Sequence, residues 1–82
     1  MNLQIDSAQN TYSEVPMSED QHVRLTHIVN GWNGHPTIRV QIREESGHLR
    51  PGPEIPVTIL GPLAAALIEL VSQSTRQANV AS

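Results

Sequence analysis

Alternating apolar and polar residues mark a strand in the middle of the chain. Within residues 37–43 the apolar positions are Ile38, Val40 and Ile42, and the polar ones are Thr37, Arg39, Gln41 and Arg43. Successive side chains of a strand point to opposite faces, so this period of two predicts one buried face and one solvated face. Two of the five basic residues of the protein stand on the solvated face.

A second alternating segment precedes the first. From His22 onward, Val23, Leu25, His27 and Val29 alternate with Arg24, Thr26, Ile28 and Asn30. The pattern predicts a strand that ends at the turn 30–34, because Asn-Gly pairs tolerate the positive φ of tight turns. We therefore expect a hairpin whose second strand is 37–43.

The C-terminal half predicts a connection, an edge strand and a helix. Gly and Pro residues interrupt regular structure in 44–53, and 55–59 alternates again around Pro56. Because Pro56 cannot donate to a neighbouring strand, this strand is expected at an edge or with its Pro facing away from the sheet. Gly61 and Pro62 then introduce a helix from Leu63 to about Arg76, since Pro suits the first helical turn. Residues 77–82 should fray.

The predicted fold class is α+β: an antiparallel sheet of three or four strands, spanning with its C-terminal helix residues 21–76. The first turns of the helix, 63–68, are apolar nearly all round, and one small sheet cannot cover every side. A core of this size is also marginal alone. We therefore predict a homodimer, with Leu63, Ala66, Leu67 and Leu70 at the interface.

Charge is distributed unevenly along the chain. The net charge is −3, but Asp6, Glu14, Glu19 and Asp20 all lie in the first 20 residues, where no basic residue occurs. From residue 21 onward five arginines oppose four glutamates, which leaves +1. Residues 1–20 keep no steady period and are predicted to be a disordered acidic tail, with a short edge strand at 3–5 as the alternative.

Several function classes lack support in the sequence. Cysteine is absent, and the histidines, at positions 22, 27, 35 and 48, have no metal-ligand spacing, so we expect no metal and no cofactor. His27 falls on the apolar side of its strand and should be partly buried. No nucleophile elbow, phosphate loop or paired-carboxylate motif is present, so we expect no catalytic residues and no enzyme. With no signal sequence or long apolar run, we expect a soluble, cytoplasmic protein without a membrane partner.

Two features could bind a partner. Arg24 should share the polar face with Arg39 and Arg43, and such a row can follow a sugar-phosphate backbone. Alternatively, this face is merely solvated and partly neutralised by Glu44 and Glu45. Trp32, the single Trp, either folds over the core or serves as a stacking platform or protein anchor.

Short motifs along the chain resemble a known family. Residues 32–36 (Trp-Asn-Gly-His-Pro), 42–44 (Ile-Arg-Glu) and 47–52 (Gly-His-Leu-Arg-Pro-Gly), followed by an alternating strand and a helix, are similar to the positive cofactor 4 transcriptional coactivators and their small bacterial relatives. The similarity covers residues 22–73. It implies a curved antiparallel sheet followed by a helix, a homodimer built through the helices, and single-stranded DNA binding on the sheet and its hairpins.

The resemblance also implies roles for single residues. Arg43 occupies the family's Ile-Arg position, Arg50 the basic position before Pro-Gly, and Trp32 the aromatic position at the first hairpin. The chain departs from the family where Glu45 and Ser46 replace stacking aromatics, and where Pro53 and Glu54 replace basic residues. Each loss of stacking could cost about 1 to 3 kcal/mol, so the departures predict weaker nucleic-acid binding.

The function predicted from the sequence is therefore single-stranded DNA or RNA binding by a non-enzymatic dimer that acts as a transcription or replication accessory factor. The predicted nucleic-acid-binding residues are Arg24, Trp32, Arg39, Gln41, Arg43 and Arg50. The alternative is a regulator or inhibitor of the same fold that binds a protein, such as a transcription or replication protein.

Overall fold

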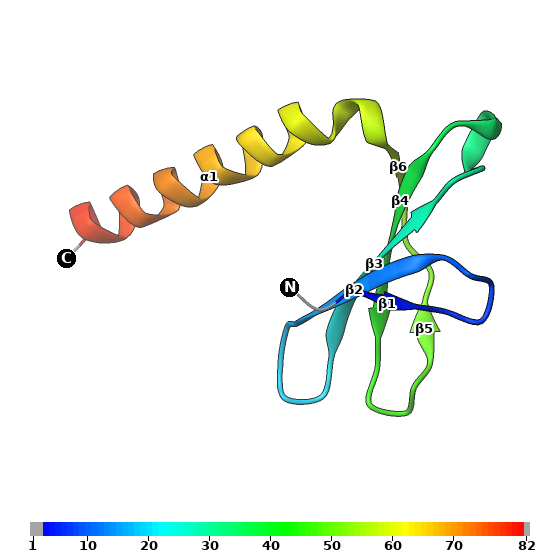
Figure 1. Cartoon of the computed structure of the whole chain (residues 1–82). Helices are drawn as coiled ribbons and strands as arrows, with labels where there is room; N and C mark the ends of the chain where they lie inside the picture. Colours follow the sequence, from blue (N-terminus) through cyan, green and yellow to red (C-terminus); the bar gives the residue numbers. More distant parts are fainter. Residues whose placement is uncertain (1–2, 82) are drawn as a thin grey trace.

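An antiparallel sheet of six strands is followed by one C-terminal helix in the computed structural model, which describes residues 3–81 and the side chains of 3–74 (Figure 1). The elements are β1 (Gln4–Ile5), β2 (Thr11–Pro16), β3 (His22–Ile28), the 3-10 turn η1 (Trp32–Gly34), β4 (Thr37–Arg43), β5 (Leu49–Arg50), β6 (Glu54–Pro56), the 3-10 turn η2 (Val57–Ile59) and α1 (Leu60–Ala81). The α+β class is confirmed, but the sheet has more strands than the three or four predicted.

Strands β3 and β4 form the centre of the sheet. The strand order in the sheet is β1-β2-β3-β4-β5. β6 also pairs with β4, at the opposite end of that strand from β5. The predicted hairpin is confirmed: β3 and β4 pair from His22 with Arg43 to Ile28 with Thr37. Its turn is a 3-10 turn in which Asn33 and Gly34 have φ of 60° and 74°, the left-handed conformation that Asn and Gly tolerate.

The N-terminal segment differs from the prediction. Residues 3–20 contain β1 and β2 rather than a disordered tail, and β2 pairs with β3 from Tyr12 to Pro16. β1 confirms the alternative of a short strand near 3–5. Apolar and polar residues alternate only weakly in β2, because no row of buried apolar side chains holds this strand. Backbone pairing with β3 holds it instead, together with Glu14, which lies opposite Arg24.

The connection 44–53 contains a short strand that the sequence did not predict. A tight turn closes when the Gly47 N–H donates to the Glu44 carbonyl at 2.8 Å, and Gly47 has a φ of 91°. β5 then pairs with the end of β4. Farther along, Gly52 lies so close to the Val40 carbonyl oxygen that a Cβ would overlap it.

The predicted strand 55–59 is too long. β6 ends at Pro56, and the next N–H, that of Val57, donates to the Pro36 carbonyl at 3.1 Å while the chain turns into η2. β6 pairs only with β4, which confirms the edge position expected for Pro56. The helix begins at Leu60, earlier than predicted, because Pro62 in its first turn lacks an N–H that would have no intrahelical partner. It continues to Ala81 instead of fraying after residue 76.

The described part of the chain has almost no apolar core. Among the described side chains only Thr26, Ile28 and Thr37 are buried. They lie on the predicted polar face, where Tyr12, Arg39 and Pro56 stand next to them in register. His27, expected to be partly buried, is exposed, because the described part of the helix does not lie across its end of the apolar face.

The helix extends away from the sheet and does not lie across it (Figure 1). The segment Val57–Ser74 is long and apolar enough to cross a membrane by length and composition, contrary to the expectation that no such run exists, and none of it is buried. Length and composition do not distinguish a membrane helix from one that packs against another protein chain.

Candidate nucleic-acid interface

The central strands gather arginines on one face of the sheet. Arg24 pairs with Gln41, Thr26 with Arg39, and His22 with Arg43. Directly paired residues of antiparallel strands point to the same side. Arg24, Arg39, Gln41 and Arg43 therefore share one surface, here called the arginine face, as the sequence pattern predicted.

Arg50 does not belong to the arginine face. Its register partner is Ile42, whereas Leu49 pairs with Arg43. Arg50 therefore points to the apolar side of the sheet, so this structure does not place it with the other predicted nucleic-acid-binding arginines. The register of β5 decides this position, and the short motif around Arg50 gave no information on it.

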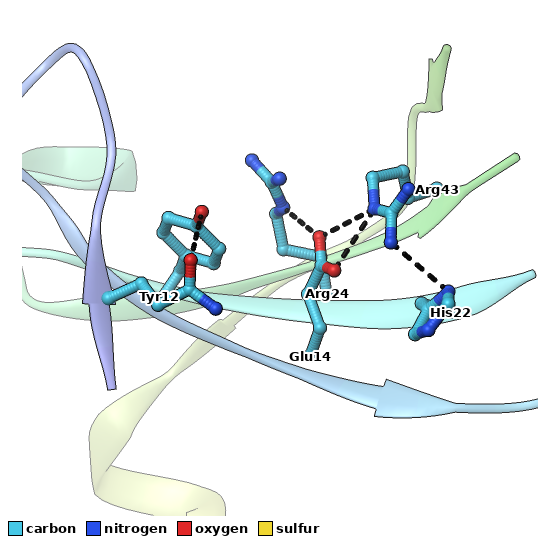
Figure 2. Close-up of polar contacts among 6 residues, drawn as sticks. Tyr12, Glu14, His22, Arg24 and Arg43 are labelled. Carbon is cyan, nitrogen blue, oxygen red and sulfur yellow. Dashed lines mark hydrogen bonds and ion pairs between the residues drawn. The ribbon is translucent and has the colours of Figure 1, made fainter. Parts of the chain in front are cut away.

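Glu14 lies between two arginines of this face (Figure 2). Its Oε2 accepts from Arg24 Nε at 2.8 Å and from Arg43 Nε at 2.9 Å, and its Oε1 accepts from Arg43 Nε at 3.0 Å. Arg43 Nη2 also lies 3.2 Å from Nδ1 of His22. The Glu14 carboxylate thus links β2 to both β3 and β4.

These contacts favour the charged forms of Glu14 and Arg43. The hydrogen bond from Arg43, supported by Arg24, lowers the pKa of Glu14 below its ordinary value of 4.5. The same hydrogen bond raises the pKa of Arg43. Both groups are therefore charged at neutral pH, and the ion pair persists through the physiological range.

A second carboxylate engages Arg39. Glu54 Oε2 accepts from Arg39 Nη2 at 3.1 Å, and Oε1 accepts from the Thr37 hydroxyl at 2.8 Å and from the Trp32 N–H at 3.2 Å. The hydrogen bond from Thr37, followed by that from Arg39, lowers the pKa of Glu54. The carboxylates that pair with the arginine face are thus Glu14 and Glu54, not the expected Glu44 and Glu45.

An aromatic ring also borders the arginine face. The Arg24 guanidinium carbon lies 4.1 Å from the centroid of the Tyr12 ring, a cation–π contact. The Tyr12 hydroxyl donates to the Gln4 side chain at 3.0 Å. Tyr12 was not among the predicted site residues, because its segment was expected to be disordered.

Trp32 lies at the tip of the β3–β4 hairpin and does not fold over the core. It is 69% exposed. It lines a mostly apolar hollow of about 310 Å³ together with Pro36, Pro56 and Val57. An exposed indole beside two prolines offers a flat apolar surface for a nucleobase or an apolar side chain of a partner.

The opposite face of the sheet forms an open apolar groove with the start of the helix. The sheet contributes Leu25, Ile38, Val40 and Ile55, and the helix contributes Leu60, Leu63, Ala64 and Leu67, around a volume of about 490 Å³. Of the predicted interface residues, Leu63 and Leu67 line this groove. Ala66 and Leu70 are exposed on the helix.

No group of His, Asp and Glu side chains suited to a metal ion is found in the described part of the chain. The four histidines are spread over β3, the η1 turn and the β4–β5 hairpin. The site is therefore a surface of arginines and carboxylates with the half-buried ring of Tyr12 and the exposed ring of Trp32. Comparison of the sequence with models of protein families, and of the chain with curated proteins and solved structures, found no match.

Proposed function

We propose that this protein is a non-enzymatic homodimeric module that binds single-stranded nucleic acid through the arginine face, as a cytoplasmic accessory factor of transcription or replication. The observation that carries the proposal is the alignment of Arg24, Arg39 and Arg43 across two adjacent strands. Arg39 and Arg43 stand four residues apart on an extended strand, about 13 Å along it. That span allows the two arginines to contact different, non-adjacent phosphates of a strand laid across the sheet.

The apolar groove supports the dimer. A protomer with a single buried apolar residue, Ile28, among its described side chains cannot offset the entropy lost on folding. Each copy carries both an open apolar sheet face and an exposed apolar helix, so two copies related by a twofold axis can cover each other. The arginine face lies on the other side of the sheet and stays accessible.

The nucleic-acid partner is supported by the residue types on the arginine face. Arginine forms bidentate contacts with phosphate and stacks on flat rings. Trp32 at the tip of the β3–β4 hairpin and Tyr12 on β2 next to Thr26 add rings that can stack on bases. Base stacking contributes about 1 to 3 kcal/mol per base. Phosphate contacts and base stacking carry little sequence information, so binding without strong sequence preference is expected.

A salt-dependent titration tests the proposal. An oligothymidine of about 20 nucleotides is titrated against the full chain and followed by Trp32 fluorescence. With three arginines of one protomer on phosphates, log K should fall against log salt with a slope of about −2. Absence of binding at low salt would refute the proposal.

A pair of variants locates the site. Replacing both Arg39 and Arg43 with alanine should weaken binding by at least tenfold and flatten the salt slope. Arg50→Ala removes the same kind of charge from the other face and should change affinity less than twofold. Equal losses from both changes would mean that charge alone, and not this face, attracts the oligonucleotide.

One observation favours a protein partner as the second candidate function. Glu14 and Glu54 already pair with all three arginines, which leaves the face with a small net charge. A mixed surface of this kind, next to the exposed Trp32, is also typical of protein interfaces. Binding that is insensitive to salt and absent for oligonucleotides would favour this function.

A further inference from the structure

The Glu14 carboxylate lies where an anionic ligand of the arginine face would bind. We propose that Arg24 and Arg43 form a site for one phosphate group of single-stranded nucleic acid, and that Glu14 occupies this site in the free protein and is displaced on binding. The inference rests on the proposed function and names Glu14 as the residue that sets its affinity.

The geometry of the site fits a phosphate group. Glu14 accepts from the Nε atoms of both arginines, at 2.8 Å from Arg24 and at 2.9 and 3.0 Å from Arg43. The two guanidinium groups therefore converge on one anion from adjacent strands (Figure 2). A phosphate presents oxygens to guanidinium groups in the same way as a carboxylate, and with more of them.

The two carboxylates of the arginine face differ in what else they hold. Glu54 accepts from the Trp32 N–H and the Thr37 hydroxyl as well as from Arg39, so it fastens the β3–β4 hairpin to β6. The hydrogen bonds found for Glu14 come from the two arginines alone. A phosphate that replaces Glu14 therefore restores every bond that the arginines lose, whereas displacing Glu54 would leave two other donors without a partner.

The site is also within reach of a ligand. The side chains of Glu14, Arg24 and Arg43 are 14%, 18% and 30% exposed. Arg43 is held from its other side by His22, and Arg24 lies over the Tyr12 ring. Both guanidinium groups therefore have supports other than Glu14, and rotation of the Glu14 side chain into solvent opens the site without loss of strand pairing.

The test compares two single-charge changes in the full chain. Glu14→Gln keeps the shape of the side chain but removes the charge that pairs with the arginines. Glu45→Gln removes the same charge from an exposed turn residue that makes no ion pair within the described part of the structure. Affinity for an oligothymidine of about 20 nucleotides is measured for both variants and the wild type over a range of salt concentrations.

Glu14→Gln should bind about tenfold more tightly than the wild type at each salt concentration, because no carboxylate then competes with the phosphate for Arg24 and Arg43. Its salt slope should stay close to that of the wild type, since the same arginines contact phosphate in both. Glu45→Gln should change affinity less than twofold. If the wild type binds and the two variants behave alike, the inference is wrong and the proposed function stands. If the wild type does not bind at low salt, both the proposed function and the inference are wrong, whatever Glu14→Gln does.

A second measurement uses the wild type, in case Glu14→Gln does not fold. The Nε–H resonances of Arg24 and Arg43 are followed by nuclear magnetic resonance while the same oligothymidine is added. Both should shift as Glu14 is replaced by phosphate, and the resonance of Arg50 on the opposite face should not. A bound state in which Arg24 and Arg43 keep their free-state positions would overturn the inference.

Discussion

Replacing Leu67 with alanine tests whether a second copy covers the apolar groove. Leu67 lines the groove from the helix and is 56% exposed in one protomer. Burying a whole leucine side chain contributes about 1.5 to 3 kcal/mol, so burying the exposed half contributes about 1 to 1.5 kcal/mol. A twofold dimer contains the substitution twice, and the dimer should therefore lose about 2 to 3 kcal/mol, or about 30- to 150-fold in its dissociation constant.

The assay is sedimentation equilibrium over a range of protomer concentrations. The matched control is Ile68→Ala, which removes a side chain of the same composition from the next residue, outside the groove. It should weaken the dimer much less than Leu67→Ala does.

Two results would refute the reasoning. One is a wild type that is monomeric and folded at the concentrations used in the oligonucleotide assays. Such a result would show that the chain is stable with its apolar groove exposed to solvent. The other is an equal effect of Leu67→Ala and Ile68→Ala, which would place the contact elsewhere on the helix. Recovery of the protein only with lipid vesicles would instead point to the membrane as the partner of Val57–Ser74.

Two further predictions concern stability, and both are measured by urea unfolding at a fixed protomer concentration, because the stability of a dimer depends on it. The pKa of Glu14 is lowered in the folded protein, so its contribution to the free energy of unfolding is present above its ordinary pKa of 4.5 and is lost as the pH falls through the lower folded value. Glu14→Gln should therefore reduce the loss of stability on acidification. An unchanged pH profile would contradict the ion pair. Gly52→Ala places a Cβ against the Val40 carbonyl oxygen and should destabilise the protein by about 1 to 3 kcal/mol. The control, Glu45→Ala in the neighbouring turn, should cost little, and equal losses would argue against the close approach at Gly52.

Local patterns predicted the centre of the sheet well. The alternation of 37–43 corresponds to β4, and the hairpin with β3 follows from the Asn-Gly turn and the two matching periods. The period of two also placed Arg24, Arg39 and Arg43 on one face, because side-chain alternation is a property of the strand backbone itself. The C-terminal helix was also expected from local sequence, because its composition and the proline in its first turn are properties of the segment itself.

Long-range pairing decided what the local patterns could not show. β2 became a strand because it pairs with β3, and only that pairing brings Glu14 to Arg24 and Arg43 from a segment expected to be disordered. The face that Arg50 occupies could not be predicted, because the register of a two-residue strand depends on its partner.

Burial shows the same division between sequence and tertiary structure. The sequence by itself determined which residues of β3 and β4 share a face, and it identified one face as apolar. The tertiary structure decided that this apolar face stays open in a single protomer, because the helix turns away from the sheet after η2 (Figure 1). It also decided that the arginine face carries its own carboxylates, since charges far apart in sequence pair only when strands place them within hydrogen-bonding distance.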